Sequence, residues 1–298
     1  MTLKGKLKRQ WLLHIMLIPG LIVIIIFNYV PLYGLIIAFQ NYNPILGFSS
    51  NWIGWDNFRF LFNQPNFIQT IWNTLYIAFF KIVGGIIVPV VFALLLNEVR
   101  LRGVKRSIQT LVYLPYFMSW VILAGVFIDL LSLEGIANTA LAALGLDKVA
   151  FLTTPRVFPW VVIVTDIWKN FGFSMVVYLA ALTGIDPGLY EAATVDGATR
   201  WRQTISITIP LLLPIVILIT VLSLGSVMDA GFDQIYNMYA PVVYSTGDII
   251  DTYVFRLGIQ QTQYSIGAAV GMFKSVIAFI LISLSYFMAD KFAGYRVF

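Results

Sequence analysis

The sequence contains no cysteine and only one histidine, His14. Disulfide frameworks, thiolate zinc sites and iron–sulfur clusters are therefore excluded, and a metal site built from histidine ligands is disfavoured. Charge is scarce as well. Asp, Glu, Lys and Arg make up 11% of the 298 residues, whereas a soluble domain carries about 25%. So few charged side chains leave too little polar surface to solvate a globule of this size.

Apolar residues, in contrast, are abundant, at 59%, with a mean hydropathy of +0.86. A helix that spans a bilayer needs about 20 mostly apolar residues. We therefore expect an all-α membrane protein that forms a single transmembrane domain over residues 1–298, with no large soluble domain. Six apolar runs are predicted to be helices: 12–39, 71–96, 108–131, 158–182, 210–228 and 266–288.

The first apolar run follows a cluster of basic residues, as a signal peptide does. It is too long for the apolar part of a signal peptide, and no cleavage site with small residues closes it. We expect an uncleaved first helix that is bent or broken near Pro19 or Pro31.

Basic residues are distributed unevenly between the gaps that separate the apolar runs. Twelve of the 19 lie at the two termini, in the gap after the second run and in the gap after the fourth, whereas four lie in the alternate gaps. Short cytoplasmic loops carry the excess of Lys and Arg. Both termini and the gap 183–209 are therefore expected on the cytoplasmic side of the membrane.

The gap 183–209 is much longer than a connection between two helices requires. Asp186 can cap a helix and Pro187 suits its first turn. Gly197 permits a sharp change of backbone direction, and residues 198–206 can form a second short helix. We predict two short helices joined at the glycine, forming a compact cytoplasmic projection whose small residues let another protein approach closely.

The same segment carries a motif. Glu191-Ala192-Ala193, Asp196-Gly197-Ala198 and Ile207 through Pro210 follow the pattern EAA-x2-DGA-x8-I-x2-P. The pattern resembles the EAA loop of ABC-importer permeases, which couples the permease to its ATPase. Thr204 stands where many members have an aromatic residue, and this departure is expected to alter how tightly the second short helix packs on the ATPase. The residues that the resemblance assigns to ATPase coupling are Glu191, Ala192, Ala193, Asp196, Gly197 and Ala198.

The resemblance extends over nearly the whole chain. Residues 55–76, 29–34, 247–256 and 264–275 resemble carbohydrate-uptake permeases, in particular the subgroup that serves complex polysaccharide fragments. Membership implies a multi-pass protein of the bacterial plasma membrane that imports oligosaccharides. It also implies a heterodimer with a second permease, two cytoplasmic ATPase subunits and an extracytoplasmic solute-binding protein.

No G-x4-G-K-[ST] phosphate-binding loop occurs in the sequence. We therefore expect no enzymatic activity and no cofactor in this chain, with ATP and magnesium bound by the partner ATPase. Closure of the ATPases on ATP would move the segment 183–209 and rock the helices from an inward-open to an outward-open state.

Charged side chains within membrane spans are costly and usually face a cavity or a partner helix. In the fourth run, the spacing of Asp166, Lys169 and Asn170 places them on one helical face. They either form an internal ion pair or line a sugar path, and we favour the path. Aromatic rings stack on sugars, although each ring by itself is more commonly a packing residue. The residues predicted to line the path are Asn73, Lys81, Tyr116, Trp120, Asp166, Trp168, Lys169, Asn170, Tyr178 and Lys274.

Convergence of Lys81, Lys169 and Lys274 would favour an acidic oligosaccharide, such as a fragment containing uronate. Asp229, near the outer end of the fifth run, is expected to be hydrated. The main alternative function is an ion-coupled secondary transporter that uses Asp166 and Lys169. That alternative explains the buried charges but gives no reason for the EAA loop.

Overall fold

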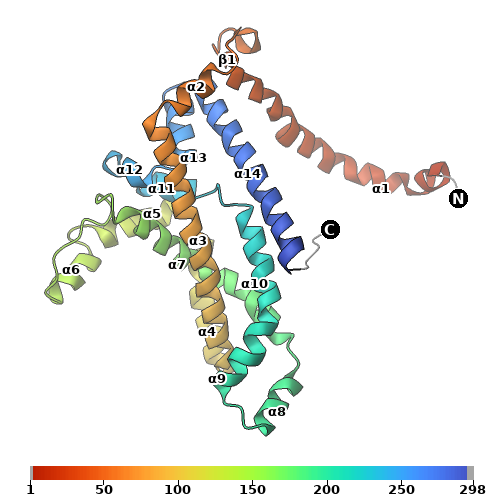
Figure 1. Ribbon diagram of the computed structural model, residues 1–298, viewed down its shortest axis with the longest axis vertical. Helices are drawn as coiled ribbons and strands as arrows, with labels where there is room; N and C mark the ends of the chain where they lie inside the picture. The colour runs from red at the N-terminus through yellow and green to blue at the C-terminus, as the bar shows by residue number, and fades with distance from the viewer. Residues whose placement is uncertain (1–2, 294–298) are drawn as a thin grey trace. The chain divides into compact units, whose positions relative to one another are not determined.

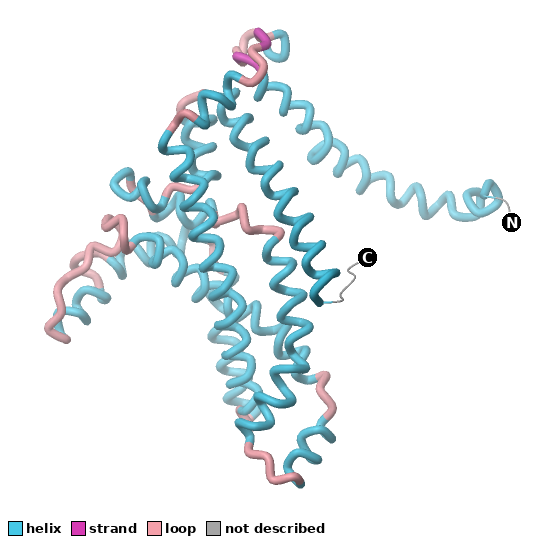
Figure 2. The backbone as a smooth tube through the Cα atoms, in the orientation of Figure 1, coloured by secondary structure: helices cyan, strands magenta, loops and turns pink. Residues whose placement is uncertain are grey.

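The structure is a computed structural model that describes residues 3–293. Helices dominate it, with one two-stranded sheet in the described part of the chain (Figure 2). Six described segments are long and apolar enough to cross a membrane, which confirms the predicted number. These segments are Ile15–Phe39, Pro65–Glu98, Trp120–Ala143, Phe158–Thr183, Arg200–Leu224 and Tyr264–Ser285.

The chain divides into two compact units. The first contains the described residues up to Gln64 together with Val254–Phe273, and the second contains Pro65–Tyr253 and the described residues from Lys274 onward. The elements of the first unit are α1 (Leu3–Ile24), η1 (Ile25–Tyr29), η2 (Val30–Phe39), β1 (Gln40–Asn41), η3 (Gly47–Ser49), β2 (Asn51–Trp52), α2 (Asp56–Phe62), η7 (Phe255–Gln260) and the beginning of α14 (Tyr264–Ala293).

The first span is irregular at one of the two predicted prolines. Helix α1 runs through Pro19, whereas the chain changes to a π-helical turn at Ile25 and to a 3-10 helix that has Pro31 in its first turn. Proline has no backbone N–H to donate, and it is tolerated in the first turn of a helix because the N–H groups there have no partner within the helix. The predicted irregularity near Pro31 is therefore confirmed.

The second unit carries most of the packed interior. Its elements are α3 (Pro65–Glu98), α4 (Arg102–Tyr113), η4 (Leu114–Phe117), α5 (Trp120–Leu131), α6 (Ile136–Ala143), α7 (Phe158–Thr183), α8 (Pro187–Val195), α9 (Arg200–Gln203), η5 (Thr204–Thr208), α10 (Ile209–Leu224), α11 (Phe232–Met238), η6 (Pro241–Val243), α12 (Tyr244–Gly247), α13 (Ile250–Val254) and the rest of α14.

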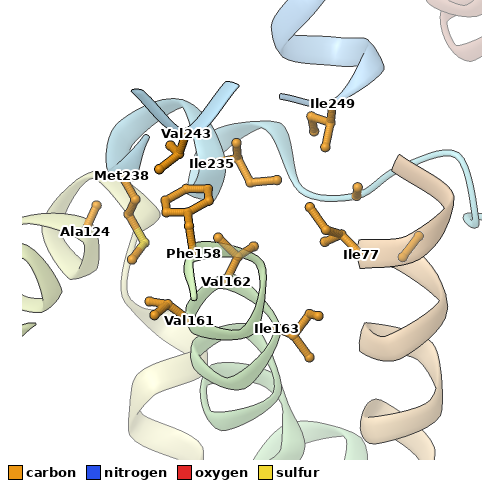
Figure 3. Close-up of a cluster of buried hydrophobic side chains, with 12 residues drawn as sticks. Ile77, Ala124, Phe158, Val161, Val162, Ile163, Ile235, Met238, Val243 and Ile249 are labelled. Atoms are coloured by element: carbon orange, nitrogen blue, oxygen red, sulfur yellow. The ribbon is translucent and has the colours of Figure 1, made fainter. Parts of the chain in front are cut away.

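Helices α3 and α7 pack on each other more extensively than any other described pair. The two helices come close at Gly84, where an added Cβ atom would force the Ile167 side chain to move. Beyond one end of this pair, Phe158 is enclosed by apolar side chains of α11 and of the residues that follow it (Figure 3). A second apolar cluster surrounds Tyr178 further along α7. The α3–α7 pair thus forms the frame on which the remaining elements are placed.

Two predicted helices differ from the structure. The predicted run 108–131 is interrupted, because Pro115 lies in a 3-10 turn and α5 begins only after Ser119, whose hydroxyl accepts a hydrogen bond from Ile122 N at 3.3 Å. The predicted run 210–228 ends early, at Leu224, and the chain is non-helical until Gly231, where φ is +96°. A proline and a capping serine explain the first break, and a left-handed glycine marks the end of the second.

Candidate functional site

The motif-bearing segment forms the predicted short helix followed by a turn, at the opposite end of the second unit from α11 and α12 (Figure 1). Asp186 caps α8 by accepting a hydrogen bond from Gly188 N at 2.9 Å, and Pro187 occupies the first turn. The turn after α8 is made at Gly197, where φ is +77°. Val195 is 89% exposed, so α8 offers apolar surface as well as its polar motif residues.

The second short helix is less separate than predicted. Thr199 caps α9, and α9 continues through the π-helical turn η5 into α10. No helix-breaking residue occurs between Arg200 and Pro210, and an unpaired carbonyl created by Pro210 is readily accommodated at a π-helical turn. The part of the motif after Gly197 therefore leads directly into the fifth span.

Three side-chain contacts hold this segment to the spans and to itself. Arg200 Nη1 lies 2.7 Å from Glu98 Oε2 at the end of α3. The Tyr190 hydroxyl lies 2.9 Å from Thr208 Oγ1. Gln203 Nε2 donates to Thr194 Oγ1 at 2.9 Å. The open pocket beside these contacts has a volume of about 490 Å³, and its lining includes Leu94, Glu98, Tyr190, Glu191, Arg200 and Thr208.

The buried charges do not pair as the sequence spacing suggests. Asp166 Oδ1 lies 3.4 Å from Lys81 Nζ on α3, and no salt bridge joins Asp166 to Lys169 within the described residues. Lys81 Nζ also donates to Ala230 O at 2.7 Å and to Gln234 Oε1 at 2.5 Å. Lys81 therefore links α3, α7 and the chain around the start of α11.

Lys169 has a different environment, although it lies on the same helix as Asp166. Its ammonium donates to Tyr116 O at 2.9 Å and lies 5.4 Å and 5.6 Å from the ring centroids of Tyr116 and Trp120. The Tyr116 ring in turn stacks on Phe173 at 4.1 Å. These distances are typical of cation–π contacts, so Lys169 anchors the segment that links α4 and α5 onto α7.

Lys274, on α14, is held by two carboxylates. Its Nζ lies 2.6 Å from Asp229 Oδ1 and 2.6 Å from Asp251 Oδ1. The expectation that Asp229 is hydrated agrees with the 67% exposure of its side chain, but the ion pair with Lys274 was not foreseen.

A cavity of about 240 Å³ lies where these charges meet the non-helical chain after α10. Unwound backbone at membrane depth is tolerated where it lines a cavity, and broken spans often border binding sites. The residues lining this cavity are Ala78, Lys81, Ile82, Gly85, Asp166, Ser174, Ser223, Ser226, Asp229 and Gly231. Of the predicted path residues, Lys81 and Asp166 line it, and Lys274 contacts its wall through Asp229.

Four polar residues of this cavity were missed: Ser174, Ser223, Ser226 and Asp229. The spacing of Ser223 and Ser226, separated by Leu224 and Gly225 near the end of a largely apolar run, was the available signal. Both donate to backbone carbonyls, Ser223 to Ile219 O at 2.8 Å and Ser226 to Ser223 O at 2.9 Å. Their oxygens retain acceptor capacity for a ligand hydroxyl.

The other predicted path residues have separate surroundings. Asn73 is buried and donates to Asp248 O at 3.1 Å, which ties α3 to the chain before α13. Tyr178 is fully buried in an apolar cluster, and its hydroxyl has no hydrogen-bond partner among the described residues. Trp168 is 44% exposed and meets the Phe127 ring at 5.5 Å. Asn170 is half-buried on α7.

Six candidate spans, a polar cavity lined by α3, α7, α10 and the chain that follows α10, and a projecting motif segment define the class of a multi-pass membrane transport subunit. The family model described as "binding-protein-dependent transport system inner membrane component" matches residues 85–295. The chain belongs to this family of permease subunits of ABC importers. It is therefore an inner-membrane transport subunit and not an enzyme, and this assignment displaces the secondary-transporter alternative.

Similar proteins extend over nearly the whole chain. The polygalacturonan/rhamnogalacturonan transport system permease protein YteP of Bacillus subtilis (strain 168) is 39% identical over 289 residues, which cover 96% of this chain and 90% of that protein. The crystal structure of a bacterial ABC transporter involved in the import of the acidic polysaccharide alginate gives a TM-score of 0.90 at 41% identity, covering 97% of this chain and 99% of that one.

A second crystal structure shows a bacterial alginate ABC transporter in complex with its alginate pentasaccharide-bound periplasmic protein. It gives a TM-score of 0.91 at 40% identity and covers 99% of both chains. The fold of this chain is thus that of a permease subunit in a binding-protein-dependent importer.

Proposed function

We propose that this chain is one half of the translocation path of an ATP-driven importer of oligosaccharides that contain uronate. Residues 183–209, called the α8 segment below, couple the path to a cytoplasmic ATPase. Glu191, Ala192 and Ala193 lie on helix α8, and Gly197 makes the turn that follows it. The observation that carries the proposal is this exposed helix, built on the EAA motif and placed between two spans.

The partners follow from the family and from the proposed topology. A second permease of different sequence completes the path, two ATPase subunits bind the cytoplasmic faces, and a solute-binding protein delivers the sugar from outside. ATP and magnesium are bound by the ATPases. Both termini and residues 183–209 lie in the cytoplasm, as the distribution of basic residues favours.

The substrate class is supported by the relatives and by the chemistry of the cavity. The similar proteins include a polygalacturonan/rhamnogalacturonan transport system permease and an ABC transporter involved in the import of the acidic polysaccharide alginate. Carboxylate and hydroxyl oxygens of Asp166, Ser223 and Ser226 line a space that suits the hydroxyl groups of a sugar.

Coupling is proposed to follow the contacts of the α8 segment. Movement of an ATPase bound to α8 displaces Arg200, and the Glu98–Arg200 ion pair passes that displacement to α3. Helix α3 carries Lys81, which contacts both Asp166 and Gln234 at the cavity. The same movement enters α10 directly, because α9 continues into it. Both walls of the cavity therefore shift with the ATPase.

The test is reconstitution of the complete complex in proteoliposomes and measurement of ATP hydrolysis with and without sugar-loaded binding protein. Glu191→Ala is expected to abolish the stimulation, and Glu134→Ala, in the exposed loop before α6, serves as the matched control and is expected to keep it. Unchanged stimulation in Glu191→Ala, or uptake driven by an ion gradient without nucleotide, would overturn the proposal.

A further inference from the structure

We propose that Lys274 binds the carboxylate of an acidic sugar in the cavity, and that the Asp229 side chain occupies the carboxylate position when the cavity is empty. The inference rests on the proposed function and specifies how this half of the path recognises its substrate. Recognition is then an exchange of one carboxylate for another on a single lysine.

Lys81, Lys169 and Lys274 differ in the groups that contact their ammonium. Lys81 donates to Ala230 O and Gln234 Oε1 in addition to its pairing with Asp166. Lys169 donates to a backbone oxygen and lies against two aromatic rings. Lys274 instead holds two carboxylates at 2.6 Å each. One positive charge faces two negative charges there, so the loss of one carboxylate leaves a balanced pair.

The two carboxylates on Lys274 are not equivalent. The Asp229 side chain is 67% exposed and lines the cavity, whereas the Asp251 side chain is 23% exposed and lies on α13. Asp229 also belongs to the non-helical stretch after α10. Its neighbour Ala230 is fixed by Lys81, so rotation of the Asp229 side chain is enough to release Lys274 while the backbone stays in place.

Exchange keeps the charge around Lys274 the same in the empty and the loaded cavity. Asp251 holds the ammonium of Lys274 in both states, so the ammonium is never left unpaired. A substrate carboxylate that replaces Asp229 restores the second contact, and Asp229 turns toward the water of the cavity. A neutral sugar has no group that can replace Asp229. The device therefore selects by charge, because the wrong ligand leaves the internal pair intact.

The inference can be tested by equilibrium dialysis on the purified complex of both permeases and both ATPases, held with a non-hydrolysable ATP analogue and without binding protein. The probes are trigalacturonate and its methyl ester, which differ in charge but keep the same sugar rings. Lys274→Gln is expected to weaken trigalacturonate binding about tenfold or more and to leave ester binding within about twofold. Asp229→Asn is expected to strengthen trigalacturonate binding severalfold, because the internal competitor is neutral.

Matched controls separate this effect from a change in folding. Asp129→Asn, at the exposed end of α5, and Lys148→Gln, in the loop after α6, are expected to bind both probes as the wild type does. Lys274→Arg is expected to keep the preference for the acid. If Lys274→Gln fails to assemble, Asp229→Asn still decides, since unchanged or weaker binding of trigalacturonate would overturn the exchange.

Failure of the inference is distinguishable from failure of the proposed function. If the wild-type complex binds the acid and the ester equally, the proposed role of Lys274 is overturned and the proposed function is not. A wild-type complex that binds neither trigalacturonate nor an alginate trimer, although its ATPase responds to loaded binding protein, overturns the proposed substrate class together with the inference.

Discussion

The α8 segment and the charged cavity are built in opposite ways. The α8 segment is contiguous in sequence, exposed, and shaped by local rules such as the Asp186 cap and the left-handed Gly197. The cavity gathers side chains from distant parts of the chain, including Lys81, Asp166 and Asp229. The comparison teaches that a docking element for another protein can be encoded locally, whereas a site inside the membrane is encoded by the packing of the spans.

The largest effect expected from a single substitution lies in the cavity, where each group depends on distant partners. Lys81→Met keeps most of the side-chain volume but leaves Asp166 and Gln234 without their cation. We expect a loss of about 3–5 kcal/mol of stability, as for one partner removed from a buried ion pair. Thermal unfolding of the complex in detergent measures it, with Lys148→Met in an exposed loop as the control. Equal unfolding temperatures for Lys81→Met and Lys148→Met would show that the cavity does not depend on its distant partners.

A smaller effect is expected from the glycines that bring α3 and α7 together. Gly84→Ala places a methyl group 2.1 Å from Ile167 Cδ1, whereas Gly85→Ala meets nothing within 4 Å. We expect Gly84→Ala to cost about 1–3 kcal/mol, typical of an overpacked core, and Gly85→Ala to be neutral or slightly stabilising. The same unfolding assay compares these adjacent variants. If Gly85→Ala is the more destabilising of the two, the described packing of α3 on α7 is wrong.

The effect on stability is expected to be smaller still at the turn after α8. Gly197→Ala has free space for its methyl group, so its cost is that of a left-handed backbone, about 1–2 kcal/mol. Coupling should suffer more than folding, because the turn orients α8. The measurement is sugar-stimulated ATP hydrolysis at a temperature where the complex is folded, with the exposed Gly103→Ala as control. Intact stimulation in Gly197→Ala would mean that the turn geometry does not matter for coupling.

The smallest effect on stability is expected at the link between the two regions. The Glu98–Arg200 pair is largely exposed, and such pairs contribute about 0–1 kcal/mol. We nevertheless expect Glu98→Arg or Arg200→Glu to lower the sugar transported per ATP hydrolysed, and the double reversal to restore most of it. If the double variant transports no better than the single variants, the pair does not carry movement between the α8 segment and α3.

Much of the fold followed from the sequence because span length and the proline at position 31 are local quantities. The helix at 158–182 was predicted to within one residue of α7 at its C-terminal end. The interruption at Pro115 and the early end of α10 were missed, because an apolar run that is broken by a turn looks continuous in hydropathy.

The candidate site likewise has features that could be predicted from neighbours in the sequence and features that depend on the packing of distant segments. The cap at Asp186 and the turn at Gly197 could be predicted, since both depend on neighbours within a few residues. The pairing of Asp166 with Lys81 could not, because the spacing along α7 points to Lys169 and only the packing of α3 on α7 brings Lys81 closer. Asp229 was recognised as exposed, but its link to Lys274 depends on the position of α14 in the second unit.

The most direct test of the central claim uses the absence of cysteine from the chain. A single cysteine at Val195, which is 89% exposed on α8, can be labelled with a membrane-impermeant maleimide. We expect labelling in inside-out vesicles stripped of ATPase, protection when the ATPase is added back, and no labelling in intact cells, whereas Ile45→Cys is labelled from outside. Labelling of Val195→Cys in intact cells, or no protection by the ATPase, would contradict it.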